Sequence, residues 1–355
     1  MSPYEEGAMM KDFSLFLCTI ILSLTTGVGA ENDLWRDPQP ISRSLPAITA
    51  DHPGNVFAAG EPMTIKVPRD LPEQAVRWQT VDDSGAAIGQ GEVVRGEAAV
   101  ANLGSLGIGW YRLDFLDASG KVLARTTVGV LSPLSVPTPQ DSPICVDSAT
   151  SWFAPSDAPR QERFAYLAAL AGVNWIRDRM SWGELETSPG VFAQNTTYDS
   201  AATLQAKYGL KVLQVFHLTA EWATDRQLDG ERPSGRFPRD LRQFYNFLKV
   251  MAQRYEGRVL AWEPWNEANI PMFGGHTIDE MCTLQKAAYL AFKAAKPDLT
   301  VCWNVYAESG TPLHVQGVLD NEAWPYFETY NIHTYTKPDD YLNAFAPARQ
   351  AACGR

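Results

Sequence analysis

An alternation of short apolar segments with amphipathic helical segments, from residue 144 to residue 333, most limits how this chain can fold. Six strand and helix pairs follow one another, and Gly172, Gly209 and Gly257 stand where helices would end. The apolar run at 211–217 is typical of a strand buried on both faces of a parallel sheet. The expected strands are residues 144–149, 175–179, 211–217, 259–265, 299–306 and 330–333.

Repeated units of this length fit either a doubly wound sheet or a (β/α)8 barrel. No glycine-rich phosphate-binding motif follows the first strand, which disfavours a dinucleotide fold. The sequence therefore predicts an α/β chain whose main part, residues 144–355, is an incomplete (β/α)8 TIM barrel of about six strand-helix units.

The region before residue 132 has a different pattern. Short strands such as 63–67, 75–80, 92–95, 109–116 and 122–130 alternate with turn signals, which predicts a small all-β sandwich over residues 31–131, with a Pro-rich start. Residues 132–143 are Pro-rich and are expected to form a linker.

The first thirty residues resemble a targeting signal. Lys11 precedes an apolar run at 13–24, and small residues end at Ala30. We therefore expect residues 1–30 to be a cleaved signal peptide and the protein to be secreted or periplasmic. A membrane anchor is the alternative, but the apolar run is about 12 to 16 residues long where a span needs about 20.

Composition limits the partners. The net charge of −11 disfavours binding to nucleic acid or to an anionic membrane surface, and it suits a neutral ligand. Eleven Trp and thirteen Tyr offer flat faces that suit sugar rings. We expect a carbohydrate substrate, no nucleic acid and, after signal cleavage, no membrane partner. The sequence leaves the oligomeric state open.

The cysteines show no metal-ligand spacing, so we expect neither a metal ion nor another cofactor. Cys18 lies in the signal segment. We expect the four other cysteines to be buried free thiols: Cys145, Cys282, Cys302 and Cys353. A bridge between Cys282 and Cys302 is the alternative.

Polar side chains gather where the predicted strands end, which is where barrel enzymes carry their chemistry. They are Arg177, His217, Asn266, Glu267, His333 and Tyr335. The strongest motif is the segment 262–269, Trp-Glu-Pro-Trp-Asn-Glu-Ala-Asn. Carboxylates in so aromatic a strand are costly to bury, and a glycosidase needs one carboxyl group kept protonated by apolar surroundings. Glu267 is therefore the candidate proton donor.

These motifs together resemble the clan-A retaining glycoside hydrolases, and are similar to families 39 and 5. Trp265-Asn266-Glu267 resembles the strand-four signature, which implies that Asn266 contacts the sugar 2-hydroxyl and that Glu267 is the acid/base. Arg177 resembles the arginine that orients the nucleophile, and His217 the histidine of the glycone subsite. The resemblance covers about residues 140–345.

His333-Thr334-Tyr335 resembles the clan's strand-six motif, in which the histidine supports the acid/base and the tyrosine holds the nucleophile. Trp222 and Trp182 are candidate sugar platforms, with a place in the core as the alternative. The resemblance implies hydrolysis of O-glycosidic bonds in a polysaccharide or oligosaccharide by a retaining two-carboxylate mechanism.

Two positions depart from the clan pattern. Ala268 stands where the family has proline, and the strand-seven nucleophile is missing, so we expect that the sequence is truncated. Glu308, Glu263 and Glu184 are the possible substitutes, but Glu308 fits a solvated loop and Glu263 an ion pair with Arg177. The competing hypothesis is a noncatalytic carbohydrate-binding or degenerate glycosidase-like protein. Sugar, linkage and endo or exo action stay open.

Overall fold

The computed structural model describes residues 46–352 except 68–69, 97–98, 226, 228–232 and 308–310. The predicted signal peptide at 1–30 therefore lies outside the described residues, as do Cys18, Glu308 and Cys353.

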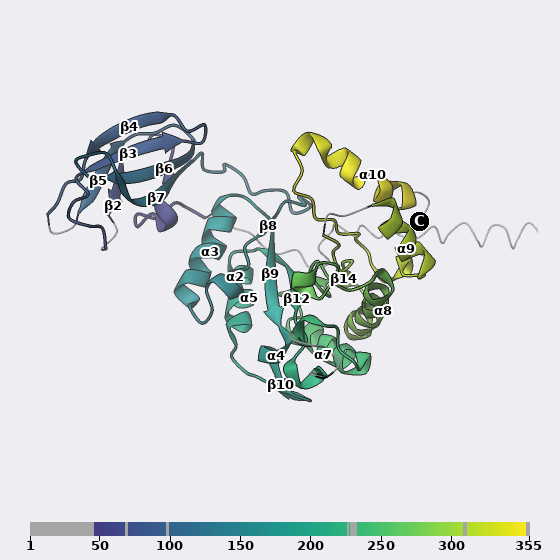
Figure 1. The fold of residues 1–355 in the computed structure, drawn as a ribbon. Coiled ribbons are helices and arrows are strands. Elements are labelled where there is room, and N and C mark those ends of the chain that lie inside the picture. Colours follow the sequence, from purple (N-terminus) through teal and green to yellow (C-terminus); the bar gives the residue numbers. More distant parts are fainter. Residues whose placement is uncertain are drawn as a thin grey trace, which may run out of the picture. The chain divides into compact units, whose positions relative to one another are not determined.

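Residues 56–131 form two sheets (Figure 1). The larger has the order β1-β7-β6-β3-β4, and the smaller pairs β2 with β5. The strands are β1 (Val56–Ala58), β2 (Met63–Lys66), β3 (Arg77–Asp82), β4 (Ala87–Glu92), β5 (Val100–Gly104), β6 (Gly109–Leu116) and β7 (Val122–Leu131). Strand β6 has the predicted bounds, and its Tyr111, Leu113 and Phe115 are buried in the alternating pattern of a one-sided strand.

The strand predicted at 92–95 lies earlier in the chain in the structure, as β4 (Ala87–Glu92). Gly89 and Gly91, which argue against a strand in the sequence, lie directly over Trp78, and a Cβ at Gly91 would collide with its indole ring. Glycine is therefore required there by close packing rather than by a turn.

The second part of the chain carries a parallel sheet of order β14-β13-β12-β9-β8, so strands adjacent in sequence are adjacent in space. The strands are β8 (Cys145–Asp147), β9 (Trp175–Ser181), β12 (Lys211–His217), β13 (Ala261–Glu263) and β14 (Thr300–Val301). The described strands of this sheet do not close into a barrel.

The prediction of a sixth strand at 330–333 is wrong. That segment runs beside the chain after β14 but pairs with it only through the isolated bridges Cys302 to Thr329 and Tyr306 to Ile332. Between them, the backbone N–H of Asn304 donates to the side-chain oxygen of Gln285, 2.9 Å away, instead of to a neighbouring strand. The ladder is interrupted for that reason.

Helices alternate with these strands. They are α2 (Thr150–Phe153), α3 (Ala158–Leu170), α4 (Trp182–Leu185), α5 (Thr197–Lys207), α7 (Leu241–Arg254), α8 (Ile278–Ala295), α9 (Pro312–Asp320) and α10 (Tyr341–Ala352), and a hairpin of β10 (Glu186–Ser188) and β11 (Val191–Phe192) follows α4. The 3-10 turns are η1 (Pro53–Asn55), η2 (Glu221–Ala223), η3 (Pro233–Gly235), η4 (Pro271–Phe273), η5 (Trp324–Tyr326) and η6 (Pro338–Asp340). Capping boxes at Thr196 and Thr277 begin α5 and α8.

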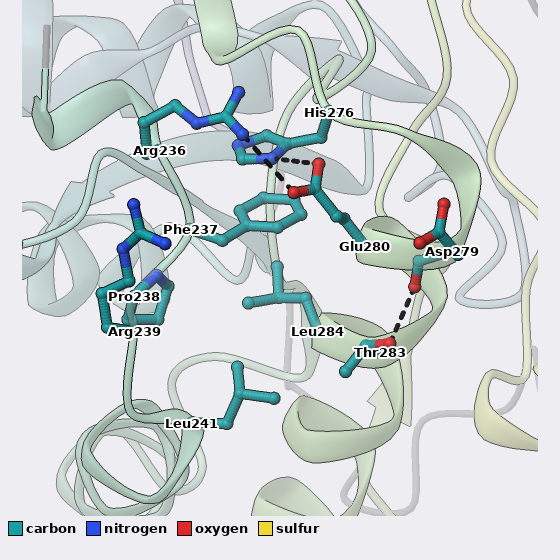
Figure 2. Close-up of a pocket in the computed structure, with 10 residues that line it drawn as sticks. All are labelled: Arg236, Phe237, Pro238, Arg239, Leu241, His276, Asp279, Glu280, Thr283 and Leu284. Carbon is teal, nitrogen blue, oxygen red and sulfur yellow. Dashed lines mark hydrogen bonds and ion pairs between the residues drawn. The ribbon is translucent and has the colours of Figure 1, made fainter. Parts of the chain in front are cut away.

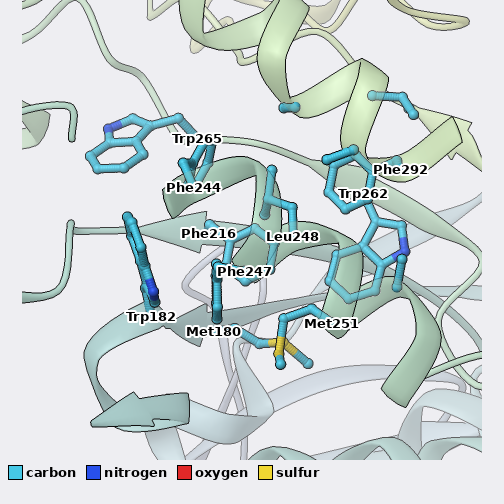
Figure 3. Packing of buried hydrophobic residues seen from close by; sticks show 14 of the residues in the cluster. Met180, Trp182, Phe216, Phe244, Phe247, Leu248, Met251, Trp262, Trp265 and Phe292 are labelled. Carbon is cyan, nitrogen blue, oxygen red and sulfur yellow. The ribbon is translucent and has the colours of Figure 1, made fainter. Parts of the chain in front are cut away.

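An aromatic core fills the space between α7, α8 and the sheet (Figure 3). Phe216 of β12 stacks on Trp262 of β13, and Trp262 stacks on Phe292 of α8, with ring centroids 5.5 and 5.3 Å apart. The apolar residues of segment 241–255 recur at helical spacing, which predicts a helix there. The observed helix α7 places Phe244, Phe247, Leu248 and Met251 in this core. The core fixes the strands whose ends carry the polar residues. Within the described residues, no helix is both long and apolar enough to cross a membrane.

Candidate active site

A buried guanidinium joins the carboxyl ends of β8 and β13. It belongs to Arg177, which lies inside β9 and not near its end as predicted. Arg177 donates to both oxygens of Glu263, at 2.7 and 3.2 Å, to Asp147 at 2.9 Å and to the side-chain oxygen of Asn266 at 2.8 Å. Asn331 adds a hydrogen bond of 2.9 Å to Glu263. The predicted ion pair between Arg177 and Glu263 is therefore present.

The network is balanced in charge. Burial disfavours the charge of Arg177, but Glu263 and Asp147 outweigh burial and raise its pKa. Burial likewise works against ionisation of Asp147, yet Arg179 and Arg177 hold the pKa of that carboxyl below its usual range. Two guanidinium groups thus face two carboxylates, and the group offers no net charge to a ligand.

Arg177 also sets the orientation of the Asn266 side chain. A guanidinium can only donate hydrogen bonds, so the atom facing it is the amide oxygen of Asn266. The NH2 group of Asn266 is then the end left to donate to another acceptor.

Glu267 lies four residues beyond β13, with its side chain largely buried. The Nδ1 atom of His333 is 2.7 Å from Oε1, and the hydroxyl of Tyr335 donates to the same oxygen at 3.4 Å. Burial, together with the charge of Glu267, raises the pKa of Tyr335, which keeps its hydroxyl a donor. Among the described residues both hydrogen bonds end on Oε1, so Oε2 is free to face a ligand.

The backbone at this edge of the sheet is unusual. Ala149 after β8, Leu218 after β12 and Glu267 after β13 have φ angles of 42°, 61° and 46°. L-residues adopt this left-handed conformation at a cost, and such residues concentrate at functional sites. Three of the five described strands of this sheet, β8, β12 and β13, are therefore followed by strained turns.

The loop behind Glu267 is held by His276, a residue to which the sequence assigned no role. Its backbone N–H donates to the carbonyl of Ala268 at 2.7 Å, and its ring stacks on Phe237 with centroids 3.4 Å apart. Figure 2 shows its Nδ1 facing Glu280 of α8, 3.1 Å away. Burial lowers the pKa of His276. The hydrogen bond to Glu280 acts against this shift, and the charge of Arg236 adds to it.

Gly274 allows this loop to approach so closely. Its φ is 119°, and a Cβ at this position would overlap the carbonyl oxygen of Gly235 and the ring of His276. The sequence pattern Gly-Gly-His at 274–276 signals a turn, but not this contact with residues forty positions earlier.

His217 ends β12 with both ring nitrogens buried, and neither nitrogen has a hydrogen-bond partner among the residues that the structure describes. The centroid of its ring is 4.7 Å from the ring centroid of Trp152 and 5.3 Å from that of Phe273. Burial, then the charges of Arg179 and Arg177, lower the pKa of His217 well below its usual value, so the ring is neutral near pH 7.

The two candidate platforms lie elsewhere. Trp182 is fully buried against Phe247, with ring centroids 5.1 Å apart, so the core alternative holds for it. Trp222 is half-buried, meets Trp182 edge to face at 5.4 Å and donates to the carbonyl of Glu186. The aromatic rings beside His217 are instead those of Trp152 and Phe273.

Sequence reasoning missed Asp147, Asn331 and Trp152. Asp147 lies inside the first predicted strand, at 144–149, and ends the observed strand β8, where it is the direct neighbour of Arg177 in β9. Nothing in the sequence pairs Asn331 with Glu263, 68 positions away. Glu184 accepts from the hydroxyl of Tyr198 at 2.7 Å, which gives it a structural partner.

A cavity of about 480 Å³ opens over the polar face of the sheet. Its lining is Cys145, Asp147, Arg177, Leu213, Glu263, Asn331, Ile332 and His333. Cys145 is exposed, contrary to prediction, because it starts the outermost described strand β8, whereas Cys282 and Cys302 are buried free thiols. Within the described part of the chain, no cluster of three or more His, Cys, Asp or Glu could hold a metal ion.

The fold of this chain is similar to that of clan-A-like glycoside hydrolases. One similar solved structure is a family 39 glycoside hydrolase from the gut symbiont Bacteroides cellulosilyticus WH2, with a TM-score of 0.53 and 22% identity. The match covers 81% of this chain and 57% of that one, so this chain spans a little over half of its relative. The predicted resemblance is confirmed at the level of the fold.

Two further similar structures have lower scores. A β-glycosidase, BGL167, has a TM-score of 0.40 and 17% identity over 56% of this chain and 65% of that one. A psychrophilic family 10 endo-β-1,4-xylanase has a TM-score of 0.40 and 14% identity, and the match covers 58% of this chain and 70% of that one. No family model and no curated protein matches the sequence.

Proposed function

We propose that this chain carries the acid/base residue of a glycoside hydrolase that cleaves O-glycosidic bonds in a polysaccharide or oligosaccharide with retention of configuration. The observation that carries the proposal is the state of Glu267. It is a largely buried carboxyl group on a strained turn, held through one oxygen by His333 and Tyr335 and free at the other.

In the proposed mechanism, Glu267 first protonates the departing glycosidic oxygen and then removes a proton from the water that releases the sugar. His333 fixes the carboxyl group through the contact of 2.7 Å. The NH2 group of Asn266, turned outward by Arg177, donates to the sugar 2-hydroxyl.

A retaining mechanism also needs a second carboxylate, the nucleophile. Glu263 is unsuited to the role because Arg177 and Asn331 already occupy its oxygens. The expectation that Tyr335 holds the nucleophile gains no support from its contact with Glu267, and the proposed role of this tyrosine is to orient the acid/base.

The test is Glu267→Gln assayed with aryl xylosides, glucosides, mannosides and galactosides that have good and poor leaving groups. Loss of the proton donor should reduce turnover of the poor leaving groups about 10²- to 10⁴-fold and affect the good ones least. Glu256→Gln is the matched control, because Glu256 precedes β13 at the opposite end of the strand and pairs with Lys296. Equal activity of both variants on poor leaving groups would refute the proposal. Sugar binding with no turnover in the unmodified protein would favour the noncatalytic alternative.

A further inference from the structure

Trp152 lies exposed on a turn that is rigidly anchored. The turn is α2, directly after β8, and Trp152 is 42% exposed. Beside it, Ser151 donates from its backbone N–H and its hydroxyl to the two oxygens of buried Asp178, at 2.9 and 2.8 Å. A large apolar ring held in water by a firm scaffold is not explained by core packing, and such rings serve as ligand anchors.

The ring of Trp152 covers His217, whose two nitrogens lack hydrogen-bond partners within the described part of the chain. A buried imidazole without hydrogen bonds is destabilising, and such a group in a folded protein calls for an explanation such as a missing ligand. A neutral imidazole offers one donor and one acceptor. A hydroxyl group can both donate and accept, so a polyhydroxylated ligand matches it.

The charges nearby indicate a neutral ligand. Arg179 lies over the Trp152 ring, 5.6 Å from its centroid, but its guanidinium is engaged by Asp147. Arg177 is likewise engaged by Glu263. Because each cation already has its carboxylate, an anionic sugar would find no uncompensated positive charge.

From this arrangement we infer that Trp152 is the aromatic platform of a sugar subsite. It covers His217 in the free protein, moves aside when sugar enters, and stacks on the apolar face of a neutral pyranose whose hydroxyl group bonds to His217. The inference rests on the proposed function, because it assigns a neutral saccharide to the same edge of the sheet as Glu267.

The experiment measures binding by calorimetry and tryptophan fluorescence, using neutral xylo-, cello-, manno- and galacto-oligosaccharides and a uronic acid oligosaccharide. Trp152→Ala should weaken binding of the preferred neutral sugar about tenfold or more, as expected for loss of an aromatic anchor, and should abolish most of the fluorescence change. Trp152→Phe should restore part of the affinity. Phe153→Ala is the matched control, because Phe153 is also exposed on α2 and should leave affinity unchanged.

The outcomes separate this inference from the proposed function. Equal affinity of Trp152→Ala and the unmodified protein overturns the platform, as does preference for the uronic acid or failure of every sugar to bind. Hydrolysis that survives Glu267→Gln overturns the catalytic role of Glu267 but leaves a Trp152-dependent binding result intact.

Discussion

Replacing Arg177 by methionine tests whether the buried ion pair organises the site. The change removes the donors to Glu263, Asp147 and Asn266 and leaves Glu263, only 1% exposed, with the single hydrogen bond from Asn331. Breaking a buried pair from one side costs about 3 to 5 kcal/mol, because it strands an uncompensated charge. That is a large share of the roughly 5 to 15 kcal/mol that stabilises a typical domain.

The assay is urea unfolding at pH 7, followed by circular dichroism and tryptophan fluorescence. Arg242→Met is the control, because the ion pair of Arg242 with Asp240 is on the surface, where solvent screens it and its loss should change stability little. The double variant Arg177→Met with Glu263→Gln should recover part of the loss, since it removes the stranded charge. If Arg177→Met cost no more than Arg242→Met, the argument that this pair is buried and structurally essential would be wrong.

Two further predictions concern backbone packing and pH. Gly274→Ala should lower stability by about 1 to 3 kcal/mol, because the new Cβ would clash with Gly235 and because alanine is strained at the positive φ of this position. Gly257→Ala, with the same φ sign but open space, should cost about 1 kcal/mol or less in a thermal melt, and an equal loss in both would contradict the packing argument. Burial lowers the pKa of His314 to about 4, so the unfolded chain takes up a proton below about pH 6.5 while the folded chain does not. Stability should fall by up to about 3 kcal/mol between pH 6.5 and 4, and His314→Phe should flatten that fall; parallel pH curves for the two proteins would disprove it.

The elements best predicted from sequence are those whose own residues determine them. Strand β12 is a continuous apolar run buried on both faces, and its observed bounds match the predicted ones. Helix α7 carries a clear apolar stripe, and its ends differ from the prediction by one residue. The domain boundaries at 31–131 and 132–143, the secreted location and the signal peptide stay predictions.

What the sequence could not predict depends on partners distant in the chain. Asn304, which follows β14, bonds to Gln285 in α8 and so interrupts the pairing with segment 330–333, and no local sequence pattern predicts that bond. In the sequence, nothing distinguishes Trp182 from a tryptophan that binds sugar, but in the structure Phe247 and Trp222 pack against it. The motif around Glu267 predicted the acid/base candidate, while its support by His276 required the folded loop.

The left-handed turns at Ala149, Leu218 and Glu267 have a consequence for how this protein can change over evolutionary time. Each turn holds conformational energy that glycine would release, so selection for heat resistance alone would tend to replace these residues. Directed evolution for thermal stability should therefore keep these residues only when turnover of the proposed saccharide substrate is also screened at every round.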